Sequence, residues 1–170
     1  DNRAGVASLL RLAQLIKDEK LDVSVSILLS VQEEVGEIGA KTAPFDIYPD
    51  EAIVVDVSFA NQPGVDINKS GKLNKGPMIG ISPVLSRDIS NQLVSLSKKN
   101  NIEYQLEIMG ESTGTNADAI SITKSGIKTG LVSIPQRNMH TAVEIVSTND
   151  IENTAKLLFE YIKNGGLNIE

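Results

Sequence analysis

Two apolar runs that stop at carboxylates constrain the fold of this 170-residue chain more than any other feature. Residues 23–31, rich in Val, Ile, Leu and Ser, lead into Glu33 and Glu34, and residues 52–55 lead into Asp56. Short β-branched runs of this kind predict buried strands. Open α/β sheets bind ligands beyond the carboxyl ends of their strands, so we expect these acidic side chains to lie at a ligand site.

The rest of the chain alternates between helical and strand patterns. Apolar residues at three- and four-residue intervals predict helices, and short apolar runs between glycines and prolines predict strands. The expected helices cover residues 2–20, 35–41, 86–99, 117–123 and 150–163, and the other expected strands cover 51–57, 78–81, 104–109 and 128–134. This alternation predicts a three-layer α/β domain.

Charge and composition exclude several classes of partner. The formal net charge of -6 would repel a phosphate backbone, so we expect no nucleic-acid partner. No run approaches the roughly 20 apolar residues that a membrane span requires, so we expect no membrane partner. The chain has no cysteine, so any metal ligands must be carboxylates and imidazole, and the composition fits a cytoplasmic protein.

The acidic residues and the single histidine, His140, form a candidate set of metal ligands. Carboxylates with one imidazole and no thiolate are typical of a hydrolytic zinc, cobalt or manganese site. Each residue also has an ordinary interpretation: a Glu pair is often a solvated surface, Asp56 suits a turn, and a lone histidine is often structural. These alternatives stay open on composition and spacing alone.

Four motifs occur along the chain in a recognisable order. They are Asp1-Asn2-Arg3-Ala4-Gly5, Val31-Gln32-Glu33-Glu34-Val35-Gly36, Val54-Val55-Asp56-Val57 and Ile134-Pro135-Gln136-Arg137-Asn138-Met139-His140. The segments Gly76-Pro77, 112–119 and 126–129 also match. Together they resemble the dinuclear metallo-aminopeptidases that include the glutamyl, deblocking and tetrahedral aminopeptidases, some of which are labelled endoglucanase or cellulase. The resemblance implies a zinc-peptidase-like α/β/α sandwich with a mixed sheet.

The resemblance also implies a role for each candidate residue. Two divalent ions, Zn or Co with Mn as a further option, would share Asp1 as a bridging ligand. Glu34 and His140 would complete the ligands of one ion, and Asp56 would bind the other. Glu33 would be the general base that takes a proton from the water activated by the metals and later delivers it to the leaving amine.

Weaker expectations concern contacts to the peptide substrate, whose free amino terminus would bind near the metals. Gly114, Asn116 and Arg137 are the candidates for these contacts, although a surface salt bridge is an equal possibility for Arg137. Many relatives carry Asp near the position of Asn116, and whether Asp118 takes its place is open.

Members of this family also have an amino-terminal segment with a further histidine ligand and an inserted β-rich domain that helps oligomers form. Neither precedes Asp1 in this sequence. We therefore expect residues 1–170 to be the carboxyl-terminal portion of one catalytic domain, truncated at its amino terminus, with at most one well-formed metal site. A homo-oligomer is expected, because the missing segment would leave an apolar surface or sheet edge uncovered.

The expected function is metal-dependent removal of amino-terminal residues from peptides. Two alternatives remain: a related zinc amidohydrolase, and a catalytically silent fragment that serves structure or assembly. Glycoside hydrolysis ranks below these functions, because a two-carboxylate glycosidase has no evident need for His140 or a bridging Asp1.

Overall fold

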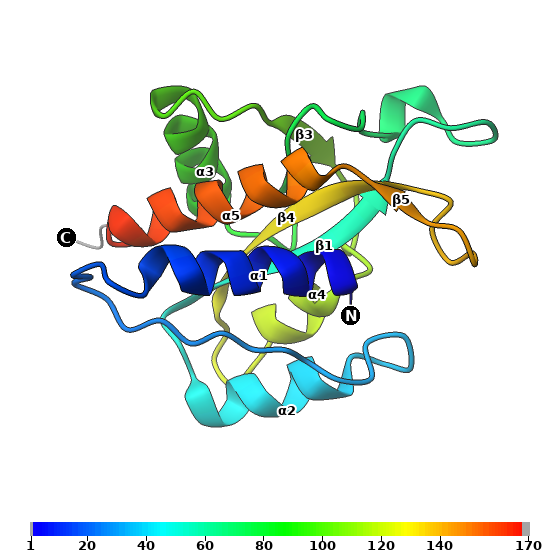
Figure 1. The fold of residues 1–170 in the computed structure, drawn as a ribbon. Coiled ribbons are helices and arrows are strands. Elements are labelled where there is room, and N and C mark those ends of the chain that lie inside the picture. The colour runs from blue at the N-terminus through cyan, green and yellow to red at the C-terminus, as the bar shows by residue number, and fades with distance from the viewer. Residues whose placement is uncertain (1, 168–170) are drawn as a thin grey trace.

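A mixed five-stranded sheet forms the centre of the molecule (Figure 1). The computed structural model describes residues 2–167. Pairing is parallel between β1 and β4 and between β2 and β3, and antiparallel between β2 and β4 and between β4 and β5. The path β1-β4-β2-β3 is formed by β1 (Glu51–Phe59), β2 (Met78–Ile81), β3 (Gln105–Ile108) and β4 (Lys128–Arg137), with β5 (Ile145–Val146) beside β4.

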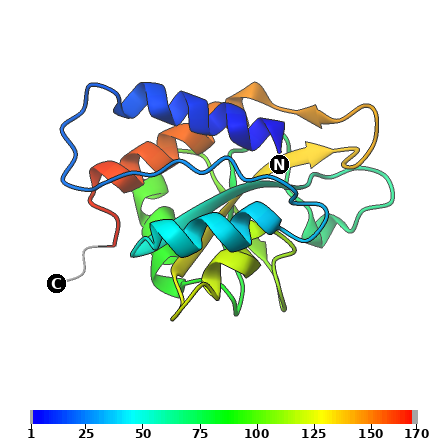
Figure 2. The same cartoon turned by 90° about the horizontal axis from the view of Figure 1, so that it is seen from below.

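Helices cover both faces of the sheet, which confirms the predicted three-layer fold (Figure 2). One face carries α1 (Arg3–Ile16), α3 (Arg87–Lys99) and α5 (Thr148–Lys163), and the other carries α2 (Ile38–Ile47) and α4 (Asn116–Ser121); a short 3-10 helix spans Ile67–Lys69. Among residues 2–167, no helix combines the length and the apolar character needed to cross a bilayer.

Strand β4 supplies the middle of both hydrophobic cores. Its residues are buried one after another between its two ends, as expected for a strand covered on both faces. Successive side chains point to opposite sides, so Leu131 packs with Ala117 and Ile120 of α4, whereas Val132 packs with Leu157 of α5. Helices therefore pack against both faces of the sheet at this strand.

The prediction of a strand over residues 23–31 is wrong. The structure has extended but unpaired chain there, and Val25, Ile27, Leu29 and Val31 are exposed. Within the described residues, no N–H of 21–31 donates a hydrogen bond and β4 is the only strand paired with β1. A strand exists only with a ladder partner, so an apolar sequence was not sufficient.

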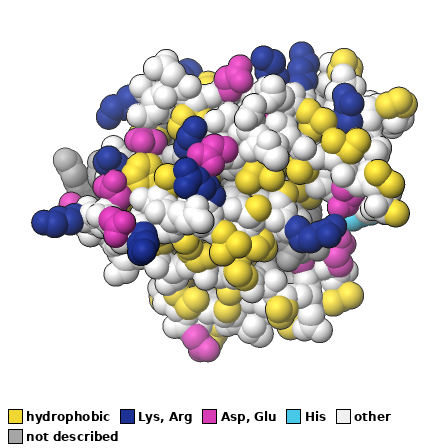
Figure 3. Space-filling model, in the orientation of Figure 1, with side chains coloured by type: hydrophobic (Ala, Val, Ile, Leu, Met, Phe, Trp, Pro, Cys, Tyr) yellow, Lys and Arg dark blue, Asp and Glu magenta, His cyan; other side chains and the backbone are white. Residues whose placement is uncertain are grey.

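The unpaired segment crosses the molecule between α1 and α2 (Figures 1 and 2). Hydrophobic side chains gather on the same part of the surface in Figure 3, and the exposed ones of this segment are Val25, Ile27, Leu29 and Val31. Exposed apolar side chains in one contiguous strip are typical of an interaction surface rather than of scattered surface residues.

Three boundaries also differ from their prediction. The helix expected over 35–41 begins later and becomes α2, and the cap of α5 is Ser147 rather than Thr148 or Asn149. Pro135 does not end β4, which continues to Arg137. Pairing of β4 with β2 ends at Ser133, so a residue without an N–H is tolerated at position 135.

Asp150, in the first turn of α5, fixes the loop that leads into β2. It is fully buried, and its carboxylate accepts hydrogen bonds from the backbone N–H groups of Asn74 (2.7 Å) and Gly76 (2.8 Å). Gly76 has a φ of 79°, and a Cβ there would lie 1.8 Å from the carbonyl oxygen of Glu103, so only glycine fits. Burial raises the pKa of Asp150, although the two N–H donors oppose that shift.

We expect Asp150→Asn to lower the free energy of unfolding by about 1–3 kcal/mol, because an amide NH2 would face one of the two N–H donors. The folded pKa of Asp150 is raised, so wild-type stability falls as pH rises from about 3.9 through that raised value. The amide of the variant does not titrate, so the difference in unfolding free energy between wild type and variant should be smaller at pH 7 than near pH 4. Urea unfolding at both pH values measures this; a deficit that grows with pH would contradict it.

We also expect the amides of residues 21–31 to exchange with solvent deuterium much faster than those of β1 and β4. The reason is that these residues donate no backbone hydrogen bond to any residue that the structure describes, whereas β1 and β4 form a buried ladder. Hydrogen exchange followed by mass spectrometry tests this, and protection in 21–31 equal to that of β1 would show that the segment is paired.

Candidate functional site

One cavity of about 540 Å³ collects five of the predicted site residues: Glu33, Glu34, Asp56, Gly114 and His140 all line it. It extends over the sheet face that carries α4, since Leu131 lines it and also packs with that helix. The cavity therefore reaches along the face of the sheet, further than the strand-end position expected from the sequence.

Asp56 is positioned by the start of α1. It is buried in β1, and its Oδ1 accepts hydrogen bonds from the Val57 N–H and from Nδ2 of Asn2, both at 2.8 Å. Asn2 also caps α1 by accepting the Gly5 N–H at 2.7 Å. Burial raises the pKa of Asp56, against the effect of its two donors. Asn2 thus connects the helix to the cavity, a role that its cap-forming residue type could have indicated.

Glu34 and His140 are in contact across the cavity rim. Glu34 Oε1 lies 3.0 Å from His140 Nε2, and both side chains are exposed. Neighbouring Glu33 is partly buried, and its pKa is raised by burial and by the charges of Asp56 and Glu34. Gln32 (φ 58°) and His140 (φ 60°) have left-handed backbones, a conformation that costs non-glycine residues about 1 kcal/mol or more. The backbone is thus strained directly before the acidic pair and at the histidine.

Helices α2 and α4 hold the segment that carries the acidic pair. The Gly39 N–H donates to the Val31 carbonyl at 3.0 Å, and a Cβ at position 39 would lie 2.5 Å from the Val31 nitrogen. From α4, Nδ2 of Asn116 donates to Ser30 Oγ at 3.0 Å. The backbone leading to Glu33 is therefore placed by close packing on α2 and one side-chain hydrogen bond.

The Glu34–His140 pair fits two neighbouring ligands of one metal ion. Two ligands about 2.1 Å from a tetrahedral zinc lie roughly 3.4 Å apart, close to the spacing of these two atoms. Over residues 2–167, however, no group of three or more His, Cys, Asp or Glu is arranged to hold a metal. Asp1, the predicted bridging ligand, lies outside the described residues. Metal ligation by Asp1, Glu34, Asp56 and His140 stays a prediction.

The loop before α4 forms part of the cavity wall and includes Gly114. Asp118 fixes this loop, because its carboxylate accepts the N–H groups of Thr113 and Gly114, both at 2.9 Å, and the Thr113 hydroxyl at 2.8 Å. Asn116 is buried behind the wall, where it holds Ser30. Asp118 is therefore a loop-ordering residue in this structure, with a different role from Asn116.

Arg137 is placed away from the cavity lining. Its Nε donates to the carbonyl oxygen of Asn61 at 2.8 Å, which ties the end of β4 to the loop after β1. The structure thus gives Arg137 a backbone partner, whereas the sequence suggested either the substrate or a surface carboxylate. A contact between Arg137 and substrate stays a prediction.

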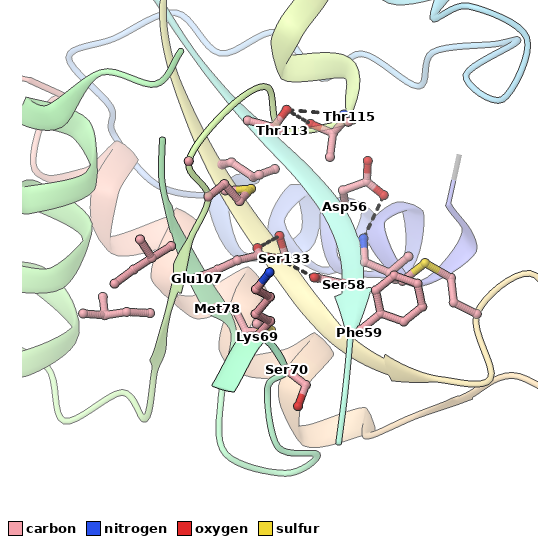
Figure 4. A pocket seen from close by; sticks show the side chains of 18 of the residues that line it. Asp56, Ser58, Phe59, Lys69, Ser70, Met78, Glu107, Thr113, Thr115 and Ser133 are labelled. Carbon is pink, nitrogen blue, oxygen red and sulfur yellow. Dashed lines mark hydrogen bonds between the residues drawn. The ribbon is translucent and has the colours of Figure 1, made fainter. Parts of the chain in front are cut away.

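Sequence reasoning missed Glu107, which projects from β3 into the floor of the cavity (Figure 4). It accepts hydrogen bonds from the hydroxyls of Ser133 on β4, at 2.6 Å, and of Ser58 on β1. A charged residue between Leu106 and Ile108 in a short strand was the available signal. Three separate strands therefore fix one carboxylate.

Comparison with known proteins places this geometry in a family. The family model described as M42 glutamyl aminopeptidase matches residues 1–157. The lysyl aminopeptidase of Pyrococcus furiosus is 35% identical over 161 residues, which are 92% of this chain and 45% of that protein. The chain thus spans about half the length of the curated relatives that it matches.

Solved structures agree with this match. An aminopeptidase from the archaeon Desulfurococcus kamchatkensis has a TM-score of 0.89 and 34% identity, and the match covers all of this chain and 51% of the other. A TET aminopeptidase from a marine-sediment thaumarchaeote has a TM-score of 0.90 and 30% identity, with 98% of this chain and 48% of the other covered. A similar structure from Thermotoga maritima, 25% identical with a TM-score of 0.74, is named an endoglucanase. This chain belongs to the M42 glutamyl aminopeptidase family.

Proposed function

We propose that this chain carries catalytic residues of a metal-dependent aminopeptidase. The observation that supports this most directly is that Glu33, Glu34, Asp56 and His140 line one cavity, with Glu34 in contact with His140. A carboxylate and imidazole set is suited to divalent metals and hydrolysis. Membership of an aminopeptidase family supports the same reaction class.

Glu34 and His140 would hold one divalent ion, with Asp1 shared between two ions and Asp56 as a ligand of the second. Zn or Co is the expected metal. When bound, such ions polarise the scissile carbonyl and lower the pKa of a bound water. Asp56 is suited to a fixed ligand role, because Asn2 and the Val57 N–H already orient its carboxylate.

Glu33 moves the proton in this proposal. It lines the cavity next to Glu34, accepts a proton from the attacking water and delivers it to the leaving amine. The positive amino terminus of a peptide is attracted to a cavity rim that carries several carboxylates. An internal peptide bond has no such amine, so the site is suited to removing terminal residues.

Self-association is a further part of the proposal. The TET1 peptidase of Pyrococcus horikoshii, a structural neighbour at 31% identity, assembles into a tetrahedron or a large octahedral shell. The exposed strip formed by Val25, Ile27, Leu29 and Val31 provides apolar surface that another chain could cover.

Light scattering at increasing protein concentration should show oligomers, and Leu29→Lys should weaken them, because a charge would replace an apolar contact. A monomer at all concentrations would contradict self-association.

Metal binding and hydrolysis can be separated by two variants. We expect His140→Ala to weaken zinc binding at least tenfold, measured by titration calorimetry, because it removes a ligand.

We expect Glu33→Gln to retain zinc but to lower the rate of amino-acid release from short peptides by at least about a hundredfold, because a proton acceptor is lost.

Glu19→Gln is the matched control, since Glu19 is exposed in the chain that follows α1 and does not line the cavity. Zinc binding that is insensitive to His140→Ala would contradict the ligand assignment. Tight zinc binding with no hydrolysis by the wild-type chain would instead favour the catalytically silent alternative. Hydrolysis of acylated amides in preference to peptides would favour a zinc amidohydrolase.

A further inference from the structure

Glu107 gives the cavity a second charged site, distinct from the residues proposed to hold metal. We propose that this site selects peptides whose amino-terminal residue has a basic side chain, with Glu107 as the specificity-determining residue. This inference rests on the proposed aminopeptidase function, and it names the substrate class of the same cavity.

The carboxylate of Glu107 is held in one orientation before any ligand binds. Ser58 donates to Oε1 and Ser133 donates to Oε2, so each oxygen has one fixed donor. Each carboxylate oxygen has a further lone pair, and an incoming ammonium or guanidinium can use it. Gly80 is the strand neighbour of Glu107 on β2, and a Cβ at Gly80 would lie 3.0 Å from side-chain atoms of Leu131 and Leu85.

The charge on Glu107 is available to a ligand. Within residues 2–167, no Lys, Arg or His forms an ion pair with it. Lys69 also lines the cavity, but it is exposed on the 3-10 helix, whereas Glu107 is half-buried. A half-buried, oriented carboxylate interacts with a cation more strongly than a fully solvated group does.

The walls around Glu107 suit the aliphatic part of a basic side chain. Met78 and Leu131 line the cavity and are almost fully buried. Lysine and arginine bury their methylene stems against apolar surface while the charged end meets a polar partner. With the backbone of the terminal residue at Glu34 and His140, its side chain would extend over these walls to Glu107.

The test measures binding of three amino-acid amides to the zinc-loaded chain by titration calorimetry. L-lysinamide, L-norleucinamide and the α-amide of glutamic acid share a backbone, and the first two have comparable stems but different charge. We expect lysinamide to bind about tenfold or more tightly than norleucinamide, because it gains a charge-assisted hydrogen bond. The glutamic acid amide should bind most weakly.

Glu107→Gln should remove the preference for lysinamide and leave the affinity for norleucinamide within about twofold. Ser133→Ala should reduce the preference in part, because Ser133 is a positioning residue that orients the carboxylate. Glu103→Gln is the matched control: Glu103 is an exposed carboxylate paired with Lys75, and the preference should be unchanged. Circular dichroism melting curves establish that each variant is folded.

Equal affinity for lysinamide and norleucinamide would overturn the inference while the proposed function stands. A preference that survives Glu107→Gln would do the same. Tighter binding of the glutamic acid amide, lost in Lys69→Met, would show that the cavity selects acidic side chains instead. If none of the three amides binds, the proposed function fails and the inference fails with it.

Discussion

The parallel pairing of β1 with β4 is the interaction on which the rest of the molecule depends. It joins Glu51–Phe59 to 128–136 in unbroken register, and these two strands provide side chains to both hydrophobic cores. Because this ladder is covered on both faces, a one-residue shift of either strand would move each of its core side chains to the opposite face. The same register sets Asp56 opposite Ser133, so the ladder also defines the spacing of the cavity floor.

The cavity combines two kinds of support. Its floor comes from strands, with Ser58, Ser133 and Glu107 tied together across the sheet. Its rim comes from connecting segments, with Glu34 and His140 placed by turns that contain left-handed residues. The floor is therefore rigid, because hydrogen bonds between strands fix its side chains. The backbone before Glu34, on the rim, depends on a few specific contacts with α2 and α4.

Periodicity predicted most of the fold, because the signal for each element lies in its own residues. The strands at 78–81 and 51–57 and the helix at 86–99 are found close to their expected bounds. Periodicity gave a wrong prediction for 23–31, where the apolar residues indicated a strand but no ladder partner exists in the described chain. Glu107 was missed for a related reason, since its partners Ser58 and Ser133 are distant in sequence and come together only through sheet pairing.

The unpaired segment before α2 would couple the proposed metal affinity to local order of the chain. Residues 21–31 donate no backbone hydrogen bond within the described chain, yet they lead directly into Glu33 and Glu34. If a metal at Glu34 orders this segment, some of its binding free energy is consumed in that ordering. By reciprocity, any partner that pairs with the segment would tighten metal binding without touching a ligand. Assembly and activation of the site would then be thermodynamically coupled, and subunit concentration would set the fraction of chains that hold metal.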